Sequence, residues 1–343
     1  MELILDPFLN ILSQFTNPKK RVFIVYLLVS ILIALVWLYF YKKKSFINSL
    51  KYIFNPKLFL SKSAKSDYKI FLINQTIMFF ISPILITQLT IATALYYYFH
   101  TISWLSSGMF SYFPIYLVVT LFTIFHFVLD DFTKFLIHRW MHKWHFLWAL
   151  HKVHHSATNL TPMTVFRTHP LEGIVFSLRA VFTQAITLSL FIFLFGNKVD
   201  LITILGANVF IFLFNILGSN LRHSHIGIRY WRWLEYILIS PAQHHLHHSI
   251  SKDHHDKNFG VSLAIWDWFF GSLHHSEEAE KLTLGISKKS NENTHTLKNL
   301  YFGPIKEILS ISVIKFNKLF NFYKSIFKKI KYLFTKPNSK NFY

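Results

Sequence analysis

The sequence predicts an all-α integral membrane protein, a bundle of about four to five helices that cross the bilayer. Two observations support this prediction. Of the 343 residues, 52% are hydrophobic and only 15% are charged, whereas about a quarter of the residues in a soluble domain are charged. The chain also contains several apolar runs of roughly 20 residues, the length that crosses the hydrocarbon core as a helix.

The first apolar run, Val22–Tyr41, has no charged residue and is flanked on both sides by basic residues. It is too long for a signal peptide and lacks a small-residue cleavage site, so we expect a membrane span. Four more runs follow, Phe71–Phe99 (interrupted by Pro83), Tyr112–Ile137, Ile174–Phe195 and Leu201–Leu217. The last two are expected to form a helical hairpin, because only the short segment GNKVD separates them.

Basic residues predict the orientation of these spans. The segment 41–70 holds eight lysines, 137–171 holds four basic residues, and the part after residue 221 holds eighteen. If the chain crosses the membrane five times, all three basic segments lie on the same side of the membrane. The positive-inside tendency identifies this side as the cytoplasm. Lys19, Lys20 and Arg21 then fall on the opposite side. The net charge of +20 is attributed to topology, and no nucleic-acid partner is expected because no soluble basic domain is visible.

Three regions are expected along the chain. Residues 1–70 form a membrane anchor and basic loop, 71–276 the main membrane domain with its cap, and 277–343 a basic tail. Within the tail, apolar residues recur at steps of three and four between Ile305 and Leu333, and lysines occupy much of the rest. This pattern predicts an amphipathic helix that lies in the headgroup region or contacts a partner.

Fifteen of the twenty histidines lie between His138 and His255, at spacings that suit metal coordination. His138 and His142 share one helical face, the pattern H-x-x-H-H occurs at 151–155 and again at 244–248, and His223 lies between the two copies. Neutral imidazole is a good ligand for iron and zinc, and the absence of cysteine excludes thiolate ligands within this chain. The sequence therefore predicts a histidine-rich metal site on the cytoplasmic side, with enough nitrogen ligands to hold two cations.

Residues near these patterns have expected roles of their own. Asp131 lies two turns before His138, where a carboxylate could fix the tautomer of a histidine. Alternatively, Asp130 and Asp131 cap the membrane end of a helix. His245 lies between ligand positions and is not expected to bind metal, and His145 is expected to pack among aromatic neighbours.

Taken together, the motifs HRWMH, HKVHH, RTHP, RHSHI, SPAQHHLHHS and KNFGVSLAIWDWFFGSL resemble the fatty acid hydroxylase and sterol desaturase superfamily over residues 131–273. The resemblance implies a cytosolic helical cap that holds a histidine-rich site for two metal ions, normally iron, with zinc as an alternative in purified protein. The ligands that it implies are His138, His142, His151, His154, His155, His223, His244, His247 and His248. It also implies His169, His225 and His255 as additional ligands or as residues behind the ligands, and a structural or supporting role for Trp266 and Asp267.

The activity implied by the resemblance is oxidation of a membrane lipid by O₂. Unactivated C–H bonds offer no handle for acid–base catalysis, whereas metal and O₂ can provide a strong oxidant. Hydroxylation, desaturation and ether cleavage stay open, as do fatty acyl and sterol-like substrates. No redox domain is expected within these 343 residues, so electrons would come from a separate ferredoxin- or cytochrome-type donor and its reductase.

Two other classes share some of these features. A metal transporter would hold its ligands inside the spans, but few ionisable residues, His126 among them, lie within the apolar runs. A non-catalytic membrane protein with a structural metal would leave lipids unchanged when His154 is replaced. A zinc protease of the H-E-x-x-H type is disfavoured, because HRWMH has arginine at the glutamate position.

Overall fold

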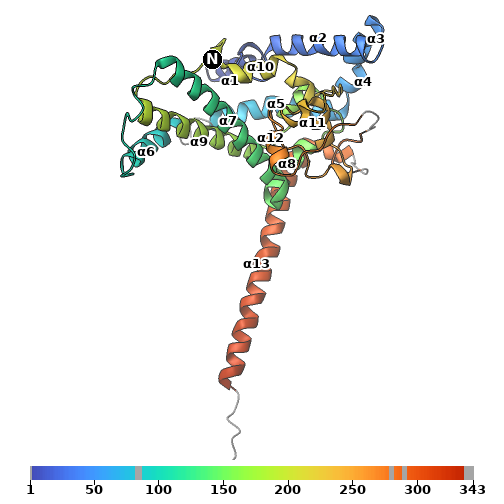
Figure 1. Ribbon diagram of the computed structural model, residues 1–343. Helices are drawn as coiled ribbons and strands as arrows, with labels where there is room; N and C mark the ends of the chain where they lie inside the picture. Colours follow the sequence, from blue (N-terminus) through green and yellow to red (C-terminus); the bar gives the residue numbers. More distant parts are fainter. Residues whose placement is uncertain (1, 82–86, 278–281, 288–291, 336–343) are drawn as a thin grey trace, which may run out of the picture.

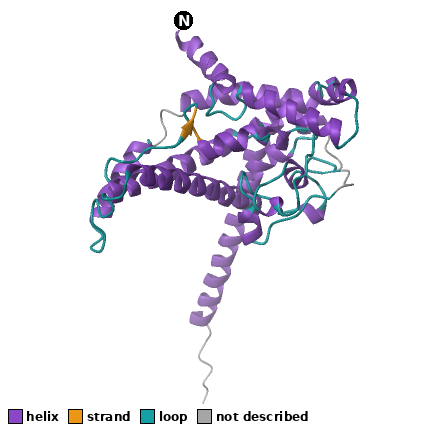
Figure 2. Ribbon diagram, turned by 45° about the horizontal axis from the view of Figure 1, so that its top comes forward, coloured by secondary structure: helices purple, strands orange, loops and turns teal. Residues whose placement is uncertain are grey.

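The computed structural model describes residues 2–81, 87–277, 282–287 and 292–335. These residues form an assembly of helices with one short β-hairpin (Figures 1 and 2). Long helices occupy one side of the body, and the short helices and loops of the histidine-rich segments occupy the other. The last helix projects away from both. The prediction of a mostly helical protein is confirmed.

Two helices are long and apolar enough to cross a membrane, α7 (Ile115–Lys143) and α9 (Pro170–Phe195). They pack against each other through phenylalanines, with the rings of Phe122 and Phe191 centred 5.2 Å apart. Proline at position 170 opens α9, and Gly196, with φ of +73°, ends it, in agreement with the usual preferences at helix ends. These helices correspond to two of the expected spans.

The expected span Phe71–Phe99 is divided between two helices. These are α5 (Lys62–Ile81) and α6 (Gln88–His100); Pro83, the expected interruption, lies outside the described residues. The second of them, α6, packs along α9.

The expected span Leu201–Leu217 is wrong as a continuous helix. β1 (Thr203–Ile204) and β2 (Ala207–Asn208) form a hairpin whose turn, Leu205 and Gly206, has positive φ at both positions, the backbone of a type I′ turn. Only the following α10 (Val209–Ile216) is helical, and it packs on α2 and α7. The helical hairpin expected with Ile174–Phe195 is therefore wrong as well.

The N-terminal layer consists of α1 (Glu2–Thr16) and α2 (Ile24–Phe40). The start of α2 contacts α10, and its end packs with Leu221, Ile226 and Ile228. Just before α2, Arg21 Nη2 donates a hydrogen bond to the carbonyl of Ser219 at 3.1 Å. Both ends of α2 therefore lie beside the segment 219–228. The expectation that Arg21 lies on the opposite side from the cap is wrong.

The remaining elements are short, apart from α13, and most of them build the cap. The α-helices are α3 (Phe46–Ile53), α4 (Pro56–Phe59), α8 (His145–His155), α11 (Pro241–His247), α12 (Ile265–Phe269) and α13 (Leu297–Thr335). The 3₁₀ turns are η2 (Pro162–Phe166), η3 (Ser219–His223), η4 (Leu234–Tyr236), η5 (Lys252–His254) and η6 (Glu292–His295).

A fully buried arginine, Arg167, fixes the position of α8. Its Nη1 pairs with Asp67 Oδ1 of α5 at 2.8 Å, and its Nε donates to the carbonyl of Val153 in α8 at 3.1 Å. Nη2 lies 2.9 Å from Nδ1 of His295, just before α13. A buried charge is tolerated when it is paired and hydrogen-bonded, so this one side chain joins α5, α8 and the approach to α13.

The 39-residue helix α13 runs crosswise to α9 and away from the body (Figures 1 and 2). Its first turns are attached to the body, where Tyr301 Oη donates to Asn74 Oδ1 at 2.9 Å. Farther along, Phe316, Phe320 and Phe327 are each more than half exposed. The helix predicted over Ile305–Leu333 is confirmed as part of α13, and its contact with a membrane stays a prediction.

Candidate metal centre

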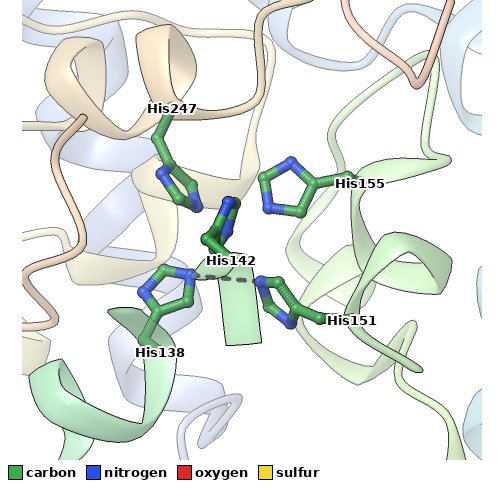
Figure 3. A group of neighbouring side chains, drawn as sticks. All are labelled: His138, His142, His151, His155 and His247. Atoms are coloured by element: carbon green, nitrogen blue, oxygen red, sulfur yellow. Dashed lines mark hydrogen bonds between the residues drawn. The ribbon is translucent and has the colours of Figure 1, made fainter. Parts of the chain in front are cut away.

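The structure brings together all nine histidines that the resemblance implied as ligands, in two adjoining groups. Within each group, one nitrogen of every ring lies within 4.8 Å of the others. The first group, shown in Figure 3, consists of His138, His142, His151, His155 and His247. The second group consists of His154, His223, His244 and His248.

The two H-x-x-H-H patterns are shared between the groups in opposite ways. From α8, His151 and His155 enter the first group, while His154 enters the second. From α11 and the residue that follows it, His244 and His248 enter the second group, while His247 enters the first. Residues four apart share a helical face, so each pattern gives a pair to one group and a single ring to the other. Both groups are thus built on the same two helices.

Three of the five rings in the first group have an acceptor at the outer ring nitrogen. His138 Nδ1 lies 2.7 Å from the carbonyl oxygen of Phe259, and His247 Nδ1 lies 2.8 Å from that of Lys257. His151 Nδ1 lies 2.8 Å from Glu172 Oε1. An acceptor at Nδ1 keeps the proton there, which leaves the lone pair on Nε2. That lone pair is available inside the group.

In the second group, Nε2 atoms approach one another directly. His154 and His244 each have Nε2 about 3 Å from Nε2 of His223, at 3.1 and 3.0 Å, and His248 Nε2 lies 3.2 Å from that of His244. The Nδ1 atoms of all four rings are buried without a hydrogen-bond partner among the described residues. The second group therefore lacks the outer acceptors that the first group has.

The two groups fit metal ions by donor type and by spacing. With metal–nitrogen bonds of about 2.1 Å, two ligands at right angles have nitrogens about 3.0 Å apart, close to the observed Nε2 separations. In the first group, Nε2 of His142, His155 and His247 is buried without a hydrogen-bond partner among the described residues. Such atoms are costly to bury unless something binds them. Imidazole sets of this kind can hold iron or zinc.

Burial keeps these rings neutral. It lowers the pKa of His154, His155, His223, His244 and His248 well below 6.5, and the neighbouring charges lower it further. The pKa of His247 is lowered to about 3, again chiefly by burial. A neutral imidazole is the form that binds metal, so the rings are ready to coordinate at neutral pH.

Among the described residues, Glu172 is a carboxylate that contacts a histidine of these groups, and none of the sequence patterns indicated it. It lies in the first turn of α9, is 1% exposed, and contacts His151 across 21 residues of chain. In the sequence, only its position shortly after the motif RTHP connects Glu172 with the histidine site. Sequence spacing does not indicate which acid faces which ring across such a separation.

Asp131, expected to fix a histidine tautomer, does not touch a histidine, and this expectation is wrong. Its Oδ1 accepts from Ser262 N at 2.9 Å, and its Oδ2 accepts from Leu263 N and from Trp266 Nε1 at 3.1 and 3.0 Å. The alternative, that it caps the end of a helix, is also wrong, because it lies inside α7 and binds a different segment. Through these hydrogen bonds, Asp131 holds the loop that follows Phe259 in place.

Asp267 completes the support of that loop. Its carboxylate accepts from Phe259 N at 2.8 Å, from Gly260 N at 2.6 Å and from Ser272 Oγ at 2.6 Å. Burial raises its pKa to about 6, against the effect of these hydrogen bonds. The peptide of Phe259 is held in this way, and its carbonyl faces His138. Asp267 thus has the supporting role that the resemblance implied.

Three further candidates, His169, His225 and His255, lie outside both groups. His169 caps α9, accepting from Leu171 N at 3.2 Å, and its Nε2 lies 3.0 Å from the carbonyl oxygen of Tyr301. His225 Nε2 lies 2.8 Å from the carbonyl oxygen of Tyr52, and His255 is exposed. The expectation that these residues add ligands or stand behind them is corrected, because other parts of the chain engage the first two. His245 also lies outside both groups, as expected.

Comparison with known proteins identifies this part of the chain. Residues 123–272, which include all nine histidines and Glu172, match the family model described as fatty acid hydroxylase. Residues 123–272, a little under half of the chain, are thus similar to the fatty acid hydroxylase family. The resemblance inferred from the motifs is confirmed.

Proteins similar to this chain include human alkylglycerol monooxygenase, 27% identical over 60% of this chain and 40% of that protein. An ornithine lipid hydroxylase from Rhizobium tropici is 27% identical over 47% of this chain and 44% of its own length. A Delta(7)-sterol 5(6)-desaturase from Aspergillus fumigatus is 30% identical, with 46% and 49% covered. The match thus covers less than half of each relative. No solved structure matches the chain.

Proposed function

We propose that the protein is an O₂-dependent di-iron oxidoreductase that hydroxylates or desaturates a membrane lipid. The observation that carries this proposal is the pair of adjoining histidine groups, which offer nine buried nitrogen ligands. The printed names of the relatives support it, since they are a monooxygenase, a lipid hydroxylase and a sterol desaturase. Fatty acyl and sterol-like lipids both stay candidate substrates.

The histidines would hold the ions, and other residues of this chain orient the rings and exclude water. Two iron ions, when bound, supply the O₂ chemistry that an unactivated C–H bond requires. Glu172 and the carbonyl groups of Lys257 and Phe259 retain the Nδ1 protons of three rings. The rings of Phe259 and Trp148 lie over the first group, with centroids 5.1 and 5.0 Å from that of His142. This apolar cover keeps water from the ligands.

The membrane supplies the substrate in this proposal. The apolar length of α7 leads directly to His138 and His142 at the end of the same helix. A lipid chain that lies beside α7 therefore extends toward the first histidine group. The distribution of basic residues supports a multi-pass protein with the histidine groups on the cytoplasmic side. Electrons would come from a separate ferredoxin- or cytochrome-type donor with its reductase, and zinc would replace iron in some purified samples.

Lipid mass spectrometry under ¹⁸O₂ tests the proposal. Cells that make the intact protein are compared with cells that make His154→Ala, and His145→Ala serves as the control because His145 is exposed and outside both groups. A new lipid carrying ¹⁸O indicates hydroxylation, and a new lipid lighter by two hydrogens indicates desaturation. Release of an aldehyde from an ether lipid indicates cleavage after hydroxylation. An identical lipid profile with the intact protein and with His154→Ala contradicts the proposal and favours a structural metal.

A further inference from the structure

A second polar site lies beside α7, apart from the histidine groups. It is a cavity of about 250 Å³. Phe127, Ile211 and Phe214 form an apolar side. The other lining residues include four cations and two carboxylates, Lys19, Arg21, Lys134, Arg222, Asp130 and Asp131. The cavity is therefore amphipathic, and its ionisable lining carries an excess of positive charge.

Two of these cations, Arg21 and Arg222, converge on one neutral acceptor. Arg21 Nη2 and Arg222 Nε both donate to the carbonyl of Ser219, at 3.1 and 3.3 Å, and Arg222 Nη1 donates to the carbonyl of Val261. Arg222 is 2% exposed, and its guanidinium lies 5.0 Å from the ring centroid of Phe214. Nε of Arg21 is buried without a hydrogen-bond partner among the described residues. The two positive charges therefore lie close together, and the Nε–H group of Arg21 donates no hydrogen bond within the described residues.

The nearby carboxylates do not neutralise this pair. Asp130 is engaged by Lys134 at 2.5 Å and by Arg179 at 2.8 Å. Asp131 accepts from two backbone N–H groups and an indole. Within the described part of the chain, no ion pair reaches Arg21 or Arg222. The charge of Asp131 acts favourably on Arg222, but one carboxylate does not balance two guanidinium groups, so a bound anion would complete the site.

We propose that this cavity binds the phosphate of an anionic lipid, with the guanidinium groups of Arg21 and Arg222 on its oxygens. Arginine suits phosphate because its planar fork donates two parallel hydrogen bonds. The apolar side of the cavity, formed by α7 and α10, suits the adjoining hydrocarbon. A free inorganic anion would satisfy the charges but would leave that apolar side unexplained.

The cavity and the metal centre lie along the same face of α7. Phe127, Asp131, Lys134 and His138 follow one another at steps of three and four along α7, so they share a face. At 1.5 Å per residue, Asp131 lies about 10 Å along the helix from His138. Arg222 directly precedes His223 of the second group. If the proposed function holds, on which this step rests, the bound phosphate anchors the lipid that the metal centre oxidises.

Calorimetric titration of the full-length protein in detergent tests the binding site. The probes are dioctanoyl phosphatidic acid, dioctanoylglycerol, which lacks the phosphate, and inorganic phosphate. We expect Arg21→Gln to weaken binding of the phosphatidic acid at least tenfold and to leave binding of dioctanoylglycerol unchanged. Lys20→Gln is the matched control, because it removes the same charge from a neighbouring residue that does not line the cavity. Helix content by circular dichroism confirms that each variant is folded.

Equal affinity of the intact protein and Arg21→Gln for phosphatidic acid overturns the proposal. If inorganic phosphate binds as tightly as the lipid, the lipid assignment is overturned and a simple anion site remains. Lys19→Gln provides a second variant should Arg21→Gln fail to fold, with a weaker loss expected because Lys19 is exposed. These titrations do not depend on turnover. Phosphate-dependent binding by a protein that oxidises no lipid would reject the proposed function and leave the binding site standing.

Discussion

Glu172 accepts a hydrogen bond from His151, with Oε1 2.8 Å from Nδ1, and both side chains are buried. The second oxygen of Glu172 has no hydrogen-bond partner among the described residues. The carboxylate therefore makes one hydrogen bond within the described residues, and this bond orients the ring of His151 in the first histidine group. Acceptors behind metal-binding histidines typically contribute 10- to 100-fold in metal affinity or activity.

Glu172→Ala should lower metal affinity by about 10- to 100-fold, because His151 loses the acceptor that holds its Nδ1 proton. Glu172→Gln should lose less, since its amide oxygen can still accept this hydrogen bond. Metal content after dialysis against a graded series of chelator concentrations measures both effects. Glu307→Gln is the control, because Glu307 pairs with Lys152 in the outer part of the structure. Equal metal content in Glu172→Ala and the intact protein would remove Glu172 from the site.

Removing one histidine from either group should reduce the metal content. His247→Ala removes a ligand from the first group and His244→Ala one from the second, so neither variant should retain more than about one ion. Lipid oxidation should fall at least about 100-fold in either variant, as expected when a direct ligand is lost. Elemental analysis and product formation are the measurements. His145→Ala should match the intact protein, and retention of two ions by both ligand variants would disprove the assignment.

Gly260→Ala should disturb the loop that supports His138. A Cβ added at position 260 would lie 2.6 Å from the carbonyl oxygen of Leu263 and 2.9 Å from Asp267 Oδ2, so the backbone would have to shift. Overpacking of this kind costs about 1–3 kcal/mol, and the carbonyl of Phe259 would move away from His138. Thermal unfolding and metal content test this together. Gly303→Ala is the control, since a Cβ there meets nothing within 4 Å.

The contact between Arg167 and His295 should make stability depend on pH. Burial, followed by the charge of Arg167, lowers the pKa of His295 to about 4. The unfolded chain binds this proton near pH 6.5, so the stabilisation is present above pH 6.5 and is lost as the pH falls toward 4. We expect the unfolding free energy of His295→Gln to depend less steeply on pH over this interval than that of the intact protein. Parallel slopes by denaturant titration would contradict this.

The lysines of α13 should bind the protein to anionic membranes. Replacing Lys318, Lys324 and Lys328 together by glutamine removes three charges from an exposed helix, at about 1 kcal/mol for each charge near an anionic surface. The protein is placed in nanodiscs without detergent, and its affinity for anionic vesicles is measured. The triple variant should bind the vesicles about 100-fold more weakly than the intact protein. High salt should weaken the binding of the intact protein in the same way. Unchanged partitioning would contradict a contact between the lysines of α13 and the membrane.

Spacing along the chain predicted the histidine patterns at 138–142, 151–155 and 244–248, because residues three and four apart on short helices face the same way. The family resemblance supplied the full set of nine, His223 included. Spacing did not predict how they divide into two groups, since this depends on how α8 and α11 pack across a separation of about 90 residues. Sequence distance favours Asp131, two turns from His138, over Glu172, but the contact that matters crosses from α9 to α8. The run Leu201–Leu217 is apolar enough to suggest a span, but the turn at Leu205 and Gly206 ends any helix there.

His154 and His155 are joined by one peptide bond, yet they belong to different groups, and the same holds for His247 and His248. An ion that binds in one group fixes the backbone of α8 and α11, and with it the ligands of the other group. The conformational entropy of α8 and α11 is then lost only once, when the first ion binds. Filling of the two positions should therefore be cooperative, with few molecules that hold a single ion. Because the proposed oxidation of a lipid needs both ions at once, such all-or-none loading would keep half-filled centres from meeting O₂.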